Sequence, residues 1–459
     1  MFEKIFFKKI ELWLALLCLV AFIFVMIIFG ALVRDHYLNA SRFENLSKIA
    51  AKISSVPSQI YRLVFQGTGN AEVKTGEKID PKKSGLNIYH NDKSLGFLLL
   101  NRYDGNISRG VTELIDLNNG KTIHTWNFKE INKLWKKSKK KIDNKIFQNA
   151  KTNLMANRYF PVHGLLTNEG DIMVANGPMH KANVCSELSI FQAEYFYHHS
   201  LELDYENNYW SPVYLSPNLT KLVPEHFIDD GIVKVSSDGD ILFKKSVIDI
   251  LNENNLGYLI NERGILSNDA IHLNDIQPVL DDGKYWKKGD IFLSVRDLSL
   301  VLLYRPSTNK IIWHKLGPWI HQHDIDILND KEIIIFNNNA RATSDLSYTI
   351  NENEVSNSIL YNFESSSITY PYIEAYKNHN IRAESNGLQE VLENKNLIMI
   401  ENHIKGRLII ADKMGKKILE YNNTNTEGYM HRTSWSRYIP RNEGQNLVKI
   451  IEEKKSKCF

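Results

Sequence analysis

Short stretches of alternating apolar and polar residues recur along most of the chain, and turns rich in Asn, Asp and Gly separate them. The clearest stretch begins at His323, turns at Asn329-Asp330 and returns through the β-branched run Ile333–Phe336. Alternation with a period of two predicts a strand buried on one face, and the Asn-Asp pair predicts a tight turn. We therefore predict a β-hairpin here, with a histidine at the start of its first strand.

Similar hairpins follow one another through the chain. Their spacing of roughly 35 to 70 residues, with short strands and Asn/Asp/Gly turns, is typical of β-propellers. We therefore predict an all-β fold, a six-bladed β-propeller, over residues 96–459. The innermost strands of a propeller begin around one axis, so the histidines at four of these strand starts are predicted to converge in one funnel. The predicted hairpins begin near Phe97, His163, His199, Gly231, His272, His323 and Gly387.

The N-terminal segment has a different pattern. The run Leu12–Val33 contains no charged residue and exceeds the roughly 20 residues that a helix needs to span a bilayer. Lysines precede the run, whereas Arg34 and Asp35 offset each other after it, so the positive-inside rule leaves the short N-terminus in the cytoplasm. A cleaved signal peptide is the alternative.

This pattern predicts a single-pass protein of the inner (plasma) membrane whose main domain is extracytoplasmic, in the periplasm. The membrane is then one partner of the chain, through one helix. The predicted parts are a cytoplasmic N-terminus (1–11), a transmembrane helix (12–33), a stalk or lead-in segment (34–95) and the propeller domain (96–459).

Composition narrows the possible partners. With 43% hydrophobic residues the chain can bury a core, and a net charge of +3 gives no overall field that favours nucleic acid. No Cys-x-x-Cys pair is present, so neither a zinc site nor a thioredoxin-like site is indicated. A bond between Cys185 and Cys458 would require the C-terminal tail to fold back, and we do not expect it.

Several motifs after about residue 95 occur in a fixed order. They are Val111–Trp126, His272-Leu-Asn274, Ser294-Val-Arg296, Gln322-His323-Asp324 with Phe336-Asn337-Asn338, Arg341, and the closing unit Gly387–Tyr438. Together they resemble the arylsulfotransferase (arylsulfate sulfotransferase) family, six-bladed propellers of the bacterial cell envelope.

The resemblance implies roles for individual residues. The sulfuryl-binding site of the family maps onto His272, His323 and Arg341, with Asn274 as a neighbour. The nearest match to the family's late His-Tyr-Arg segment is His431, which Arg follows directly, so His431 is the candidate nucleophile. Substrate contacts are expected from Asn274, Arg296, His163 and His199.

The chemistry of these residues agrees with that mapping. A sulfuryl group in transfer spreads charge over three oxygens and needs fixed donors, which arginine and imidazole supply. A neutral imidazole can also attack and carry the group covalently. The resemblance, with which this chemistry agrees, implies a PAPS-independent enzyme that moves a sulfuryl group from an aryl sulfate to a phenolic acceptor through a sulfohistidine. No metal, nucleotide donor or other cofactor is expected.

Other functions stay open at this point. His321 and His323 share one face of a strand and could hold a transition metal together with His272. A non-catalytic propeller, tethered to the membrane, could instead bind an anionic or sulfated ligand in the funnel, or serve as a scaffold. Each histidine could also be a packing residue, and Arg341 an ordinary loop arginine. The sequence does not identify the natural donor or acceptor, or the oligomeric state.

Overall fold

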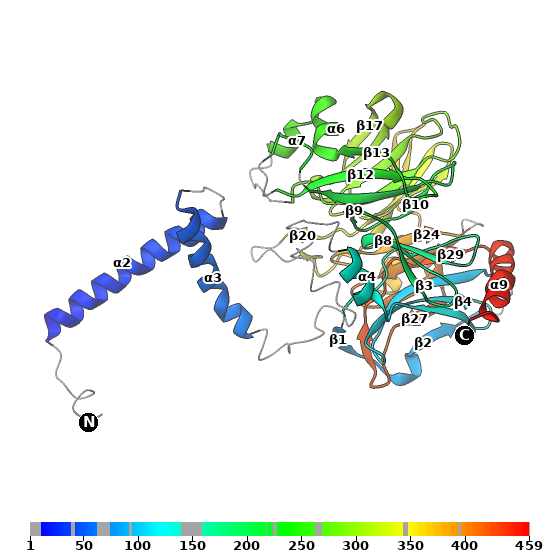
Figure 1. Cartoon of the computed structure of the whole chain (residues 1–459), viewed down its shortest axis with the longest axis horizontal. Helices are drawn as coiled ribbons and strands as arrows, with labels where there is room; N and C mark the ends of the chain where they lie inside the picture. Colours follow the sequence, from blue (N-terminus) through cyan, green and yellow to red (C-terminus); the bar gives the residue numbers. More distant parts are fainter. Residues whose placement is uncertain are drawn as a thin grey trace. The chain divides into compact units, whose positions relative to one another are not determined.

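The computed structural model describes residues 11–37, 42–61, 74–90, 94–138, 158–216, 218–223, 227–261, 269–342, 348–392 and 396–458. The chain divides into two compact units, Met1–Ala71 and Glu72–Phe459. We call them the helical unit and the β unit, and each is described by itself (Figure 1).

The helical unit consists of α2 (Leu12–Tyr37) and α3 (Glu44–Tyr61). With 26 residues at about 1.5 Å each, α2 is about 39 Å long, which exceeds the hydrocarbon thickness of a bilayer. Within the described ranges it is the one helix long and apolar enough to cross a membrane. The structure therefore has the apolar helix that the sequence predicts at this place.

The β unit consists mainly of antiparallel strands in a propeller-like arrangement, with four sheets of four or five strands (Figure 1). The first sheet contains β29 (Arg437–Ile439), β3 (Phe97–Asp104), β4 (Arg109–Asp116) and β5 (Thr122–Asn127). The second contains β14 (Leu273–Pro278), β15 (Ile291–Val295), β16 (Leu300–Arg305) and β17 (Lys310–Leu316). The third contains β18 (Ile325–Asn329), β19 (Glu332–Asn337), β22 (Asn357–Asn362) and β23 (Ser367–Thr369). The fourth contains β24 (Leu388–Val391), β25 (Leu397–Asn402), β26 (Arg407–Asp412), β27 (Lys417–Asn422) and β2 (Gly85–Ile88).

A further sheet has eight strands. It contains β6 (Leu165–Leu166), β7 (Ile172–Ala175), β8 (Gly177–Ala182), β9 (Leu188–Tyr197), β10 (Glu202–Leu203), β11 (Tyr209–Leu215), β12 (Asp229–Val235) and β13 (Ile241–Ser246). Short pairs form between β1 (Lys74–Lys78) and β28 (Tyr429–His431), and between β20 (Arg341–Ala342) and β21 (Tyr348–Thr349). The helices are α4 (Ile131–Ser138), α6 (Val247–Glu253), α7 (Tyr258–Asn261), α8 (Ile373–Asn378) and α9 (Arg441–Lys455), and the 3₁₀ turns are Pro81–Lys83, Arg296–Leu298 and Pro306–Thr308.

The predicted hairpins are confirmed. They correspond to the pairs β3–β4, β6–β7, β10–β11, β12–β13, β14–β15, β18–β19 and β24–β25. In the β14–β17 sheet every residue of β15 is buried, whereas β17 alternates between exposed and half-buried residues. An inner strand is covered on both faces by neighbouring sheets, so its residues are apolar throughout, while an outer strand keeps the polar–apolar alternation.

The two ends of the β unit meet in one sheet. The last strand, β29, pairs with β3, with Arg437 opposite Leu99 and Ile439 opposite Phe97. Residues that we expected in the lead-in segment also contribute strands, since β2 pairs with β27. Pairing of the earliest and latest strands closes the propeller-like array and leaves no free edge between them.

The C-terminal tail folds back, contrary to our expectation. Helix α9 places Leu447 and Ile451, which lie one turn apart, in the core beside the first sheet. This packing brings Cys458 to Cys185, and the two form a disulfide. The sequence-based expectation was therefore wrong, because the apolar stripe of α9 stabilises a docked tail.

Buried carboxylates, and the half-buried Glu390, join successive sheets. In each case a carboxylate of one sheet accepts a backbone N–H at or near the first strand of the next. The contacts are Asp230 with Leu273 (2.8 Å), Asp275 with Ile325 (3.1 Å), Asp324 with Gln389 (3.1 Å), Glu390 with Tyr438 (2.8 Å) and Glu401 with Trp435 (2.8 Å). These bonds fix the first strands relative to one another, and hence the residues that precede them.

Candidate functional site

A residue with a left-handed backbone precedes each of β6, β10, β14, β18, β24 and β29, which we call the first strands. Outside glycine this conformation is uncommon, and it costs about 1 kcal/mol or more. Its repetition at one place in successive sheets marks the ends of these strands as a candidate site. The residues are His163 (φ 47°), His199 (φ 56°), His272 (φ 46°), His321 (φ 60°), Asn386 (φ 55°) and Trp435 (φ 50°).

The four histidines predicted to converge do come together, and Trp435 lies beside three of them. The centroid of the His199 ring lies 5.2 Å from that of His272 and 6.4 Å from that of His323. The Trp435 ring lies 5.1 Å from His163, 6.3 Å from His323 and 6.4 Å from His199. We call these five residues the funnel cluster. They are far apart in sequence, and the shared position before a first strand brings them together.

Two members of the funnel cluster have both ring nitrogens in contacts. Nδ1 of His323 donates to Oδ1 of Asn338 at 2.7 Å, and its Nε2 accepts the backbone N–H of Asn386 at 3.1 Å. Nδ1 of His163 accepts the backbone N–H of Leu201 at 3.2 Å, and its Nε2 lies 3.4 Å from a carboxylate oxygen of β10. In this arrangement neither ring has a lone pair available for attack on a substrate.

His272 and His199 each have one ring nitrogen without a hydrogen bond to any described residue. Nδ1 of His272 lies 2.5 Å from Oδ2 of Asp269, and Nδ1 of His199 lies 2.7 Å from Nδ1 of His198. A carboxylate that accepts from Nδ1 fixes the tautomer that leaves the lone pair on Nε2, as in a catalytic triad. His272 therefore has the arrangement of an activated imidazole.

Burial keeps several of these imidazoles neutral. It lowers the pKa of His323 to about 3, and the positive charge of Arg296 contributes to the shift. Burial also lowers the pKa of His199 well below its usual value, with further contributions from His198 and His272. Taking a charged group out of water disfavours the charged form, so His199 and His323 carry no charge at pH 7.

Arg296 supplies the positive charge beside the funnel cluster. Its Nε donates to Asp297 at 2.7 Å, and its Cζ lies 5.6 Å from the centroid of the Tyr348 ring. Its two terminal nitrogens have no hydrogen-bond partner among the described residues, although its side chain is only 10% exposed. Its charge also helps to lower the pKa of His199, after burial and the nearby imidazoles. A buried guanidinium with free N–H groups can bind an anion.

The other two polar residues singled out from the sequence have different surroundings. Asn274 is fully buried in β14, and its Nδ2 donates to the backbone carbonyl of Gln322 at 2.8 Å, so it links the second and third sheets. Arg341 is 41% exposed at the start of β20, and its guanidinium is paired with Glu354 at 2.6 Å. The structure therefore places Arg296, not Arg341, in electrostatic contact with the imidazoles.

His431 has its own set of contacts. It lies in β28, its Nδ1 donates to the backbone carbonyl of Tyr429 at 2.9 Å, and its ring is stacked on Tyr103 with centroids 5.8 Å apart. A side chain at Gly105 would collide with the ring. The hydrogen bond to Tyr429 fixes the proton of a neutral His431 ring on Nδ1.

Sequence reasoning missed Trp435 and His403. Trp435 contacts three histidines of the funnel cluster, but its Thr-Ser-Trp-Ser segment lacks the histidine that marked the other strand starts. His403 follows β25 and is buried, and its ring lies 5.8 Å from Phe160. Burial lowers its pKa well below the usual value, and the charges of Arg432 and His323 add to the effect. The available signal for Trp435 was position alone, since it precedes the last strand as His163 precedes β6.

The metal alternative gains no support from the geometry. The ring centroids of His321 and His323 lie 6.1 Å apart, and Nδ1 of His323 is hydrogen-bonded to Asn338. Within the described ranges, no group of three or more His, Cys, Asp or Glu side chains is arranged as a metal site.

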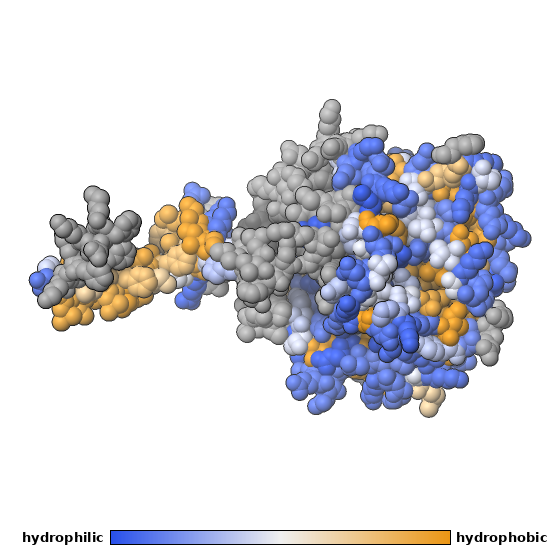
Figure 2. All heavy atoms as spheres, turned by 90° about the horizontal axis from the view of Figure 1, so that it is seen from below, coloured by the Kyte–Doolittle hydropathy of each residue, from blue (hydrophilic) through white to orange (hydrophobic). Residues whose placement is uncertain are grey.

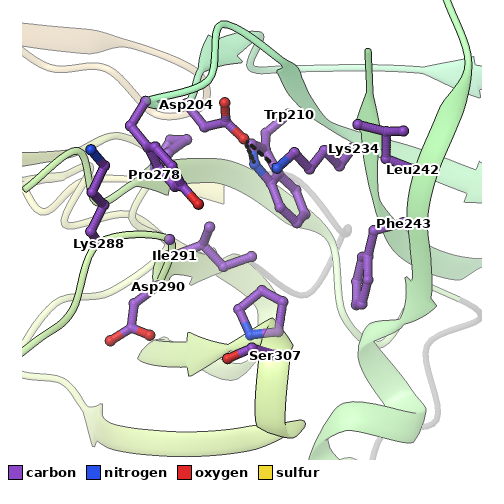
Figure 3. A pocket seen from close by; sticks show the side chains of 13 residues that line it. Asp204, Trp210, Lys234, Leu242, Phe243, Pro278, Lys288, Asp290, Ile291 and Ser307 are labelled. Atoms are coloured by element: carbon purple, nitrogen blue, oxygen red, sulfur yellow. Dashed lines mark hydrogen bonds and ion pairs between the residues drawn. The ribbon is translucent and has the colours of Figure 1, made fainter.

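A separate pocket of about 330 Å³ lies at the other end of the strands (Figure 3). It is lined by Pro278, where β14 ends, whereas His272 precedes the start of that strand. Asp204 in this pocket accepts hydrogen bonds from Lys234 at 2.8 Å and from the indole of Trp210 at 3.2 Å. Because these polar groups are already paired with one another, we assign the pocket no part in the chemistry of the funnel cluster.

Comparison with known proteins identifies the family. The family model described as "Arylsulfotransferase (ASST)" matches residues 173–424, which is more than half of the chain. The chain belongs to the arylsulfotransferase family. The matched part contains His199, His272, Arg296 and His323, whereas His163, His431 and Trp435 lie outside it.

Solved structures add only distant likeness. A protein of unknown function from Bacteroides caccae is 12% identical, with 71% of this chain and 94% of that chain covered and a TM-score of 0.43. TolB from Acinetobacter baumannii is 10% identical, with 88% and 74% covered and a TM-score of 0.38. Virginiamycin B lyase from Staphylococcus aureus is 13% identical, with 57% and 70% covered and a TM-score of 0.30. No curated protein matches the chain.

Proposed function

We propose that this arylsulfotransferase-family protein moves a sulfuryl group from an aryl sulfate to a phenolic acceptor through a sulfohistidine, without a metal or PAPS. The observation that carries the proposal is the funnel cluster, in which neutral imidazoles adjoin an arginine with free N–H groups. An aryl sulfate combines an anion with an aromatic ring, and the cluster offers a guanidinium beside several aromatic rings. Arg296 would hold the sulfate oxygens, and His199 would contact the same group.

The covalent step needs one imidazole with a free lone pair. His272 fits this requirement best, because Asp269 fixes its tautomer and its ring lies 5.2 Å from that of His199. Its Nε2 would attack sulfur, the bond from sulfur to the aryl oxygen would break, and the phenolate would leave. The oxygen of an acceptor phenol would then attack sulfur, the N–S bond would break, and the acceptor would lose its proton to the released imidazole or to water.

His431 is the second candidate for the covalent carrier, on the family resemblance and on its own tautomer. Arg341, His323 and Asn274, which the resemblance also implies, would then act around it or support the funnel cluster. Substitution separates the two candidates. If His272 carries the group, His272→Asn abolishes labelling by donor and His431→Asn retains it. The reverse result would assign the role to His431.

We further propose six blades. The eight-stranded sheet would count as two blades, β6–β9 and β10–β13, whose strands pair with each other at Val213 with Tyr197 and at Tyr214 with Phe196. Six residues with positive φ, one before each first strand, support this count. A solved structure of the β unit tests it.

The cellular placement is also proposed. Helix α2 would anchor the protein in the inner membrane, with residues 1–11 in the cytoplasm and the β unit in the periplasm. The Cys185–Cys458 disulfide supports an oxidising compartment, since disulfides are rare in the cytosol. Protease added to spheroplasts should digest the β unit, and full protection would contradict this orientation.

Turnover of a chromogenic aryl sulfate with a phenol present tests the activity. Release of the chromogenic phenol that depends on the acceptor supports transfer. Binding of the aryl sulfate without release would favour the alternative, a membrane-tethered propeller that binds an anionic or sulfated ligand. The observation that favours this second function is that both ring nitrogens of His163 and of His323 are already in contacts.

A further inference from the structure

The helical unit has an apolar face that none of its described residues covers. Four side chains of α3, which are 44 to 57% exposed, lie three or four residues apart and therefore on one side of the helix. We call them the α3 stripe: Leu46, Ile49, Ile53 and Val56. A different side of α3, with the small residues Ser47, Ala50 and Ala51, is the buried one.

The third side of α3 is basic. Lys48 and Lys52 are exposed. They flank the α3 stripe on one edge, and the buried residues flank it on the other. A helix with an apolar stripe beside basic residues is typical of helices that lie in the interface of an anionic membrane. A helix that rises from the membrane into water as a stalk would leave this stripe in contact with water.

The stripe is continuous with the surface of α2. A groove between the two helices is lined by Ile28 and Leu32 of α2, by Phe43 just before α3, and by Leu46 of α3. Figure 2 shows hydrophobic surface along α2 in this unit. The lipid-facing surface of an anchoring helix would therefore extend through the groove onto α3.

The groove also contains positive charge. Arg34 and Arg42 line it, and its one carboxylate, Asp35, already accepts the backbone N–H of Phe43 at 3.3 Å. Two arginines beside apolar walls match the phosphate and acyl chains of a phospholipid. The groove volume, about 840 Å³, is in the range of ligand sites.

We propose that α3 lies in the membrane interface next to the end of α2, and that the groove between them holds an anionic phospholipid, with Arg34 and Arg42 at its phosphate. This inference rests on the proposed anchoring by α2. It replaces the expected stalk by a helix that lies along the membrane surface.

The test uses the full chain in lipid nanodiscs, with Cys18→Ser as background and one new cysteine carrying a fluorophore. The positions are Ile53→Cys on the α3 stripe, Lys52→Cys as its matched neighbour on the basic side, and Ile23→Cys within α2. Each label is quenched either by iodide from water or by spin-labelled lipid. We expect lipid quenching to exceed iodide quenching at Ile53 and Ile23, and the reverse at Lys52.

The outcomes separate the anchor from the interface helix. Strong iodide quenching at Ile53 with lipid quenching at Ile23 would overturn the proposal and leave the anchor intact. Strong iodide quenching at Ile23 would overturn the anchor itself.

A label at Ile49→Cys measures which phospholipid lies beside α3. We expect spin-labelled phosphatidylglycerol to quench it at least about twofold more than spin-labelled phosphatidylcholine, because the arginines attract the anionic headgroup. The double variant Arg34→Gln/Arg42→Gln should reduce this ratio to about one. Equal quenching by both lipids in the unaltered chain would contradict the proposed phospholipid site.

Discussion

At the scale of single residues, the hydrogen bonds and charges of each side chain distinguish residues proposed to act in sulfuryl transfer from residues that support the fold. Arg296 and Arg341 give the clearest contrast. Arg296 is nearly buried beside the funnel cluster with free N–H groups, whereas Arg341 is paired with Glu354 and 41% exposed. Loss of one charged donor to a transition state costs on the order of a hundredfold in rate.

We therefore expect Arg296→Ala to lower kcat/KM for an aryl sulfate by about a hundredfold or more, and Arg341→Ala to lower it by less than about tenfold. Steady-state kinetics with both variants measures the contrast. A larger loss in Arg341→Ala would return the sulfate-binding role to the residue that the family resemblance implies.

Asp269 is a positioning residue in the same account. Burial alone would raise its pKa, but the hydrogen bond from His272 and the nearby positive charge of Arg296 lower the pKa of Asp269 overall. Asp269→Asn would allow the other tautomer of His272, with the lone pair on Nδ1. We expect kcat to fall by about a hundredfold or more while KM changes little, and Asp269→Glu to restore part of the rate. A large rise in KM alone would instead assign Asp269 to substrate binding.

At the scale of strands and sheets, buried carboxylates hold the first strands together and also make stability depend on pH. Burial raises the pKa of Glu390 to about 7, and the neighbouring Glu202 adds to the shift. The pKa of Glu390 is higher in the folded state than in the unfolded state. Its contribution to stability is therefore complete below about pH 4, where the group is protonated in both states, and it is lost as the pH rises through about 7.

Glu390→Gln keeps the acceptor for the Tyr438 N–H and removes the charge. We expect its Tm to exceed that of the unaltered protein by a margin that grows between pH 5 and pH 8. The margin should correspond to at most about 3 kcal/mol, or a few degrees. Calorimetry at several pH values measures it, and a margin that is constant with pH would show that Glu390 does not titrate in this range.

At the scale of the whole molecule, the disulfide ties the last residues of the chain to the strand connection at Cys185. The loop that it closes spans 273 residues, and cross-links of long loops stabilise by about 2–5 kcal/mol. We expect Cys458→Ser to lower the Tm of the β unit by several degrees. Cys18→Ser, which removes the one free cysteine of the described chain, is the matched control and should leave the Tm unchanged. Equal effects of the two variants would show that the disulfide does not stabilise the β unit.

The sequence predicts those features that local pattern determines. The hairpin after His323 follows from alternation and a turn, and the convergence of His163, His199, His272 and His323 follows from their repeated position before a strand. The docked tail could not be predicted in this way, because it depends on contacts between α9 and strands far away in the chain. His403 and Trp435 were missed for a related reason, since neither belongs to the repeated histidine pattern.

The most direct test of sulfuryl transfer is the mass of the intact protein after incubation with an aryl sulfate in the absence of acceptor. We expect the mass to increase by one sulfuryl group, the increase to disappear when a phenol is added, and His272→Asn to prevent it. Retention of the label in His272→Asn and its loss in His431→Asn would move the covalent step to His431. The absence of both turnover and a gain in mass with a range of aryl sulfates would contradict the proposed enzyme and favour the binding propeller.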